Sequence, residues 1–202
     1  MAYEYIAIER EYASGGNEIG QKAADVLGLP FYGHEILEIV AKREGVSPAR
    51  LERMEERATN SFIYSIYAMS QIINGSADES SLPSPERLHL KEVEVIKELA
   101  QSGPCVFIGH SAGAVLKERP DVLRVFIYAD RKFRTARAQS VYGVDSTRVV
   151  STLEKSDNRR ANFYRMNMME NWDERKNYHL MLNSARLGVD TCVKLIVSAY
   201  GR

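Results

Sequence analysis

Two short segments of the chain, residues 105–108 and 122–129, consist almost entirely of apolar residues. Strands with so little alternation between apolar and polar side chains are typical of parallel sheets covered by helices on both faces. The intervening segments instead show apolar residues at helical spacing. This succession of strand and helix predicts an α/β fold with right-handed crossovers and excludes an antiparallel sandwich.

The other segments continue the same succession along the chain. We expect further strands over residues 3–9, 31–32 and 179–182. Residues 75–85 are polar and rich in Gly, Ser and Pro, which predicts a loop. Helices are expected over residues 19–27, 34–44, 47–58, 61–74, 88–101 and 188–200. The helix over 61–74 is apolar on most of its circumference, so it lies in the core or forms a homodimer interface.

Composition narrows the class of protein. The chain has 202 residues, 45% of them hydrophobic, and 27 Lys and Arg residues balance 27 Asp and Glu residues. A chain of this size buries a core without disulfides or a structural metal, so we expect a single domain over residues 1–202. Cys105 and Cys192 lie in apolar runs and are expected to be reduced core residues. The sequence shows neither a signal peptide nor a long apolar span, which predicts a cytoplasmic protein with no membrane partner.

Basic residues are concentrated in one part of the chain. Residues 131–165 contain nine basic and three acidic residues, although the whole chain has a net charge of +0. A local positive segment on a neutral protein indicates a small anionic ligand rather than a nucleic-acid partner. Few aromatic residues lie among the basic ones, which also argues against nucleic acid. A solvated basic helix face is the alternative interpretation.

The turn after the first strand, residues 13–17, reads Ala-Ser-Gly-Gly-Asn. Such a turn is the usual phosphate site of an open α/β sheet, because small residues allow close approach and helix N-terminal amides attract anions. It departs from the P-loop pattern when aligned on Gly15. Gly16 then stands where a lysine contacts the phosphates, and Asn17 where a hydroxyl holds magnesium. A turn of small residues with no ligand is the alternative.

A set of short motifs keeps its order along nearly the whole chain. The motifs are Arg10-Glu11-Tyr12, Ser14-Gly15-Gly16, Glu18-Ile19, Leu29-Pro30-Phe31-Tyr32, Ser61-Phe62, Gly103-Pro104-Cys105-Val106, Leu123-Arg124-Val125-Phe126-Ile127, Asp157 with Arg159-Arg160, Leu182-Asn183-Ser184 and Arg186-Leu187-Gly188. As a set they resemble the cytidylate kinase-like family of bacterial proteins.

The resemblance implies a P-loop NTPase-type fold, a three-layer α/β/α arrangement with a five-stranded parallel sheet. It also implies a helical, monophosphate-binding-type insertion over residues 34–103 and a lid-type region over residues 131–165. The implied reaction transfers the γ-phosphoryl group of ATP, with Mg²⁺, to a nucleoside monophosphate or a similar small phosphorylated acceptor. A non-catalytic protein that binds nucleotides or anions on the same fold is the alternative.

The chain departs from this family where relatives hold their substrate. Gly33 stands where the family often has Asp, His110 where it often has Arg, and Gly113 where it often has Asp. The resemblance therefore places His34 and His110 on the substrate-binding side of the site. A hydrogen-bonded structural histidine is the alternative for His110.

Phosphoryl transfer needs positive charge on the transferred group, which arginine supplies through its forked donors. The lid interpretation makes Arg159, Arg160, Arg165 and Asp157 the candidate catalytic residues. Neighbouring helical residues point about 100° apart, so we expect one of Arg159 and Arg160 to face the sheet edge and the other solvent. Asp157 orients an arginine or titrates a substrate hydroxyl. A surface helix with salt bridges is the alternative.

The nucleotide is expected to contact the first turn and three more distant residues. In our interpretation Arg10 supplies the charge that the missing lysine does not. Glu9 or Glu11 either holds a water molecule of magnesium or pairs with Arg10. The predicted nucleotide-binding residues are Arg10, Ser14, Gly15, Gly16, Asn17, Glu18, Arg134, Arg137 and Asn183. The alternatives are solvent-facing arginines and, for Asn183, a turn-forming role.

Overall fold

The computed structural model describes residues 3–51 and 85–201. Several expectations fall elsewhere in the chain. The helix over 61–74 with its core or dimer interpretation, the motif Ser61-Phe62 and most of the loop over 75–85 lie outside the described residues, as does much of the insertion expected over 34–103.

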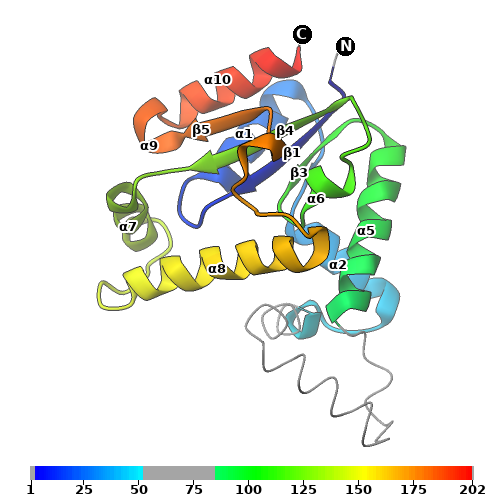
Figure 1. The fold of residues 1–202 in the computed structure, drawn as a ribbon, viewed down its shortest axis with the longest axis horizontal. Coiled ribbons are helices and arrows are strands. Elements are labelled where there is room, and N and C mark those ends of the chain that lie inside the picture. Colours follow the sequence, from blue (N-terminus) through cyan, green and yellow to red (C-terminus); the bar gives the residue numbers. More distant parts are fainter. Residues whose placement is uncertain (1–2, 52–84, 202) are drawn as a thin grey trace, which may run out of the picture.

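A sheet of five parallel strands forms the centre of the molecule (Figure 1). The strands are β1 (Tyr5–Arg10), β2 (Phe31–Tyr32), β3 (Cys105–Ile108), β4 (Val122–Tyr128) and β5 (Leu180–Asn183). Their order across the sheet is β2-β3-β1-β4-β5, which places β1 in the middle and β2 at an edge. The predicted α/β fold with a five-stranded parallel sheet is confirmed.

In the described part of the chain, each of the five strands is followed by one or two α-helices. The helices are α1 (Gly16–Leu27), α2 (His34–Glu44), α5 (Pro85–Ser102), α6 (Ala112–Val115), α7 (Arg131–Ser140), α8 (Val149–Met168), α9 (Ser184–Leu187) and α10 (Val189–Tyr200), with a 3-10 turn η2 at Arg175–Asn177. Gly28 ends α1 in the left-handed conformation, as its position before Pro30 predicts. The region expected as a lid comprises α7 and α8.

Alternate side chains of β1 explain why the fold has three layers. Tyr5 and Ala7 belong to a core cluster that also contains side chains of α2 and α5, such as Ile36. Ile6 and Ile8 belong to the cluster on the opposite face, with side chains of α1 and α10. Successive strand residues point to opposite faces, so an apolar strand has to be covered on both sides.

The carboxyl ends of three strands differ by one residue from the prediction, and only β4 is shorter, ending at Tyr128 rather than at residue 129. β1 extends past residue 9 to Arg10 because Arg10 pairs with Ile127 of β4. β5 ends at Asn183 rather than at residue 182 because Asn183 pairs with Tyr128. Sheet pairing therefore carries the polar residues Arg10 and Asn183 to the carboxyl edge of the sheet, where α/β proteins bind ligands.

Candidate functional site

The first turn presents a helix N-terminus without a side-chain cap. Gly15 precedes α1 with φ of +83°, and no side chain accepts a hydrogen bond from the first turn of the helix at this position. The first intrahelical bond runs from Ile19 N to Gly15 O, at 2.9 Å. The amides of Gly16, Asn17 and Glu18 precede that bond, so they form the electropositive end of α1. This arrangement suits an anion.

Arg10 is held across this turn by close packing. A Cβ built on Gly16 would lie 2.5 Å from the Cβ of Arg10, and one built on Gly109 would overlap the Arg10 guanidinium group. The Nε of Arg10 donates to Oδ1 of Asn17 at 2.9 Å. The two glycines therefore make room for a cation beside a turn that has no lysine of its own.

A cavity of about 530 Å³ opens next to Arg10. It lies between the carboxyl ends of β1 and β3 and the helices α2 and α8. Arg10, Arg159 and Arg160 line it, so residues far apart in the sequence bring three guanidinium groups to one space. His34 and His110, the two predicted substrate-binding residues, line the same cavity, as does Asn17.

Arg160 is fixed to the end of β1. Its Nη1 donates to the carbonyl oxygen of Arg10 at 2.9 Å. Burial and the nearby charge of Arg10 lower the pKa of Arg160 to about 9, against the opposing effect of Asp157 and Glu9. The guanidinium group thus stays charged at neutral pH, in a place where its charge is poorly compensated. An anion in the cavity would relieve this repulsion.

The expectation that one of Arg159 and Arg160 faces solvent is wrong, because both line the cavity. Helix α8 runs along the cavity, so two side chains that leave the helix in different directions both reach the same cavity. Arg165, about a turn and a half of helix later, is exposed and donates to Asn162 Oδ1 at 2.8 Å. It is not among the residues that line the cavity.

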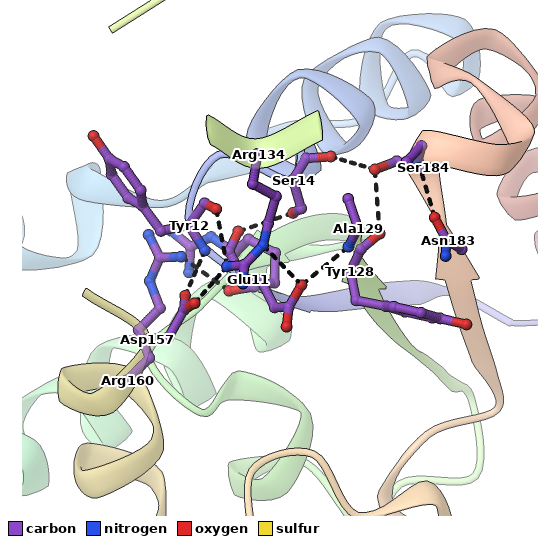
Figure 2. Close-up of polar contacts among 12 residues, drawn as sticks. Glu11, Tyr12, Ser14, Tyr128, Ala129, Arg134, Asp157, Arg160, Asn183 and Ser184 are labelled. Atoms are coloured by element: carbon purple, nitrogen blue, oxygen red, sulfur yellow. Dashed lines mark hydrogen bonds and ion pairs between the residues drawn. The ribbon is translucent and has the colours of Figure 1, made fainter. Parts of the chain in front are cut away.

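Asp157 and Arg134 join α7 and α8 to the first turn (Figure 2). Oδ1 of Asp157 accepts a hydrogen bond from Tyr12 N at 2.7 Å, and Oδ2 pairs with Nη1 of Arg134. Arg134 also lies 3.3 Å from Oε2 of Glu11, which accepts from Ala129 N at 3.0 Å. Asp157 orients an arginine, one of the two predicted roles, and Glu11 pairs with Arg134.

Arg137 and Glu18 form an ion pair beside the turn. Nη2 of Arg137 lies 2.5 Å from Oε2 of Glu18, and its guanidinium group lies next to Gly15. The hydrogen bond from Lys22 lowers the pKa of Glu18, burial opposes this, and Arg137 lowers the pKa further. Arg137 is therefore placed over the amides of the turn, as a nucleotide-binding residue would be.

Ser184, the first residue of α9, connects the first turn to the end of β4. Its Oγ lies 2.5 Å from Ser14 O and 3.2 Å from Tyr128 O (Figure 2). Oδ1 of Asn183 accepts from Ala185 N at 3.1 Å and from Arg186 N at 3.3 Å. Asn183 thus caps α9, while its contact with an adenine ring stays a prediction.

Replacing Ser184 with Ala should lower the free energy of unfolding by about 1–2 kcal/mol, because buried carbonyl oxygens lose their donor. Ser151→Ala is the matched control, since Ser151 donates to Arg148 O at 2.9 Å on the exposed side of α8. Its effect should stay below about 0.5 kcal/mol. Urea denaturation measures both, and equal effects of the two substitutions would contradict this role of Ser184.

The sequence interpretation missed a buried polar group behind the cavity. Glu92 of α5 is fully buried and contacts His110, and His89 lies on its other side. Glu92 follows Leu88 by four residues and precedes Val95 by three. This spacing places it in the apolar stripe of the helix, a signal that could have identified it. Trp172 also belongs to this missed set, because its indole donates to Oε2 of Glu9 at 3.1 Å.

Within residues 3–51 and 85–201, no helix has the length and apolar character needed to cross a membrane. Among those residues, no three or more His, Cys, Asp or Glu side chains are grouped so that they could hold a metal ion.

Comparison with known proteins supports the kinase-like fold. The model of the cytidylate kinase-like family matches residues 5–186, and this confirms the resemblance. No curated protein matches the chain. An uncharacterized protein from Eubacterium ventriosum ATCC 27560 is similar in structure, with a TM-score of 0.71 and 20% identity over 97% of each chain.

Two solved structures of kinases are also similar in fold. Shikimate kinase from Bacteroides thetaiotaomicron has a TM-score of 0.52 and 14% identity, covering 96% of each chain. A gluconokinase from Sinorhizobium meliloti 1021 has a TM-score of 0.51 and 14% identity, over 99% of this chain and 93% of that chain.

Proposed function

The chain belongs to the cytidylate kinase-like family, and we propose that it is an ATP-dependent phosphotransferase that moves the γ-phosphoryl group to a nucleoside monophosphate or a similar small acceptor. One observation carries the proposal. Arg10, Arg159 and Arg160 line a single cavity beside the uncapped N-terminus of α1. Positive charge and helix amides around one space are what a transferred phosphoryl group requires.

Each part of the site has a role in this proposal. The amides at the start of α1 and the guanidinium group of Arg137 hold the nucleotide phosphates. Arg159 and Arg160 stabilise the charge on the oxygens of the γ-phosphoryl group as it moves. The acceptor occupies the cavity on the side of α2 and β3, where His34 and His110 lie. Asp157 and Arg134 keep α8 in place, so that the arginines reach the phosphates.

The family also implies Mg²⁺, and the residues at the turn do not fit a magnesium site held by the protein. Oδ1 of Asn17, in the place of the usual hydroxyl, accepts from Arg10 Nε. Glu9 accepts hydrogen bonds from Ser111 N and from the indole of Trp172, both at 3.1 Å. Magnesium chelated by ATP needs few protein ligands. We therefore expect the magnesium to enter the site bound to the nucleotide.

A second function is a nucleotide-binding or anion-binding protein without turnover. The observation that favours it is the turn itself, because Gly16 stands in the place of the phosphate-bridging lysine and Arg10 is engaged with Asn17. In this case the same cavity would take an anion and the reaction would stop at binding.

One experiment separates the two functions. The purified protein is incubated with ATP, Mg²⁺ and a panel of nucleoside monophosphates and unphosphorylated alcohols, and ADP formation is followed together with ATP binding by calorimetry. ADP that depends on an acceptor supports the phosphotransferase. Binding without turnover across the panel supports the second function, and absence of ATP binding excludes both nucleotide-based proposals.

Arg10→Ala should weaken ATP binding at low salt by about tenfold or more, because a charge-assisted contact is lost. Arg43→Ala is the control, since it removes the same charge from an exposed pair with Glu98 on the far ends of α2 and α5. That change should leave the affinity within about twofold. Calorimetry measures both variants, and an unchanged affinity in Arg10→Ala would remove Arg10 from the phosphate site.

A further inference from the structure

His110 lines the cavity and belongs to a polar cluster, which we define as Glu92, His110 and His89. Glu92 Oε1 lies 3.1 Å from His110 Nδ1, a hydrogen-bond distance. Glu92 Oε2 lies 3.6 Å from His89 Nδ1, which is close enough for charge attraction only. The ring of His89 in turn packs edge-on against Phe163 of α8. The cluster therefore joins α5 to the wall of the acceptor side.

Glu92 is an unfavourable residue to bury at this place. Its side chain is 0% exposed on the apolar face of α5, where a leucine or methionine would fill the same space. Within the part of the chain that the structure describes, Glu92 Oε2 and His89 Nδ1 have no hydrogen-bond partner. A buried carboxylate that is only partly compensated destabilises the folded state. Such groups next to a cleft are typical of functional sites.

The backbone that carries His110 is strained. Gly109, His110 and Ser111 follow β3 directly and have φ values of +77°, +55° and +54° in succession. Residues other than glycine adopt this left-handed region at a cost. The turn is held by Ala112 N donating to Gly109 O and by Ser111 N donating to Glu9 Oε1, both at 3.1 Å. Strain of this kind is typical of places where a side chain needs one fixed direction.

We propose that Glu92 is a positioning residue that keeps the proton of His110 on Nδ1, and that His110 Nε2 removes a proton from a hydroxyl group of the phosphoryl acceptor. The proposal rests on the phosphotransferase function stated above. With Nδ1 donating to Glu92, the neutral imidazole carries its lone pair on Nε2, across the ring. The ring lines the cavity and its Nδ1 meets Glu92, so in this proposal Nε2 is the nitrogen that meets the acceptor.

With an alcohol as the acceptor, each bond that forms is matched by one that breaks. The hydroxyl proton goes to Nε2 while the acceptor oxygen forms a bond to the γ-phosphorus. The bond from the γ-phosphorus to the bridging oxygen breaks, and ADP leaves with that electron pair. His110 then returns the proton to solvent.

A base is useful only for one class of acceptor. An alcohol holds its proton at neutral pH, whereas a phosphate monoester is largely ionised above a pKa of about 6 and can attack without a base. The cluster therefore points to an alcohol that also carries an anionic group, held by the arginines of the cavity. A nucleoside monophosphate that attacks through its phosphate would leave the cluster without a use.

The charged and titratable groups around His110 come from four elements, and they pair with it, lie beside its partner Glu92 or line the same cavity. These are Glu92 and His89 on α5, Glu9 and Arg10 on β1, His34 and Glu35 on α2, and Arg159 and Arg160 on α8. Burial raises the pKa of Glu92, but the hydrogen bond with His110 and the proximity of His110 and His89 outweigh it and lower the pKa overall. Glu92 therefore stays ionised, as a partner for the imidazolium that forms during the step has to be.

The first part of the test does not depend on activity. Nitrogen NMR of histidine-labelled full-length protein should show His110 with its proton on Nδ1 above its pKa. Glu92→Gln keeps the size of the side chain and removes its charge, so the pKa of His110 should fall by about one unit or more. Glu94→Gln, on the exposed side of the same helix and paired with Lys91, should leave it unchanged. A proton on Nε2 in the native protein, or an unchanged pKa in Glu92→Gln, overturns the proposal.

The second part tests the acceptor. With ATP and Mg²⁺, we expect ADP formation with glycerate or glycerol 3-phosphate and less with CMP, UMP or AMP. Glu92→Gln should lower kcat by about tenfold or more and move the acidic limb of its pH profile to lower pH, with KM for ATP unchanged. Added imidazole should partly restore turnover to His110→Ala, which also covers the case in which Glu92→Gln does not fold.

The outcomes separate the two proposals. The two alcohols carry different anions, so the preferred one shows whether the cavity selects carboxylate or phosphate. Phosphorylation of the nucleoside monophosphates alone, without an effect of Glu92→Gln on the pH profile, overturns the base role while the phosphotransferase stands. ATP binding without ADP formation for any acceptor overturns the phosphotransferase, and the base role falls with it whatever the NMR result.

Discussion

Arg160→Ala should lower kcat for ADP formation by about 10³-fold or more, the range found for arginines that stabilise a transferred phosphoryl group. Arg160 combines three properties that suit this role. It is half-buried, it lines the cavity, and its Nη1 is anchored to Arg10 O. Because the guanidinium group is already fixed, little ordering is needed at the moment of transfer.

The same substitution should leave the fold intact. Burial and the charges of Arg10 and Arg159 disfavour the Arg160 guanidinium group in the absence of an anion, so its removal relieves repulsion. We expect the free energy of unfolding in urea to stay equal or to rise. Arg160→Lys keeps the charge but not the forked donors, and should recover only part of the activity. Activity of Arg160→Ala within about tenfold of the native protein would contradict a catalytic role.

Asp157→Ala should lower the free energy of unfolding by about 2–4 kcal/mol, because it leaves a largely buried arginine and a backbone amide without their partner. Asp157 pairs with Arg134 and accepts from Tyr12 N at 2.7 Å. Since these contacts join α8 to the first turn, ATP affinity should fall together with stability. Urea denaturation and calorimetry measure the two effects.

Glu154→Ala is the matched control for this prediction. Glu154 lies on the same helix and pairs with Arg131 at 2.7 Å, but its side chain is 60% exposed. An exposed pair contributes little, so the control should change stability by less than about 0.5 kcal/mol. In the double variant Asp157→Ala with Arg134→Met, part of the loss should be recovered, because the unpaired charge is gone. No recovery would mean that the pair itself is not the cause.

The sequence predicted the fold well because its signals are local. The uninterrupted apolar run over 105–108 and the helix over 34–44 have the bounds that the structure shows. Gly28 followed by Pro30 predicted the end of α1 correctly. The two extended strand ends, at Arg10 and Asn183, both arise from pairing with β4, which joins segments more than fifty residues apart. No pattern within a short window contains that pairing.

The site was predicted only in part, because residue type does not show what a side chain faces. Arg159 and Arg160 were candidates from the sequence, but their common cavity depends on how α8 lies along the sheet edge. Arg134 looks like a ligand contact in the sequence, whereas Glu11 and Asp157 compensate its charge in the structure. Glu92 escaped notice because a glutamate in a helix is usually exposed.

The site combines two parts that differ in local stability, the central strand β1 and the helix α8. Arg10 ends a strand whose other residues are almost fully buried between neighbours on both sides, so its amides should exchange with deuterium only when the whole protein opens. Helix α8 has few buried residues and is joined to β1 and the first turn through polar contacts. Its amides should therefore exchange by local detachment, and a bound nucleotide should slow exchange in α8 far more than in β1.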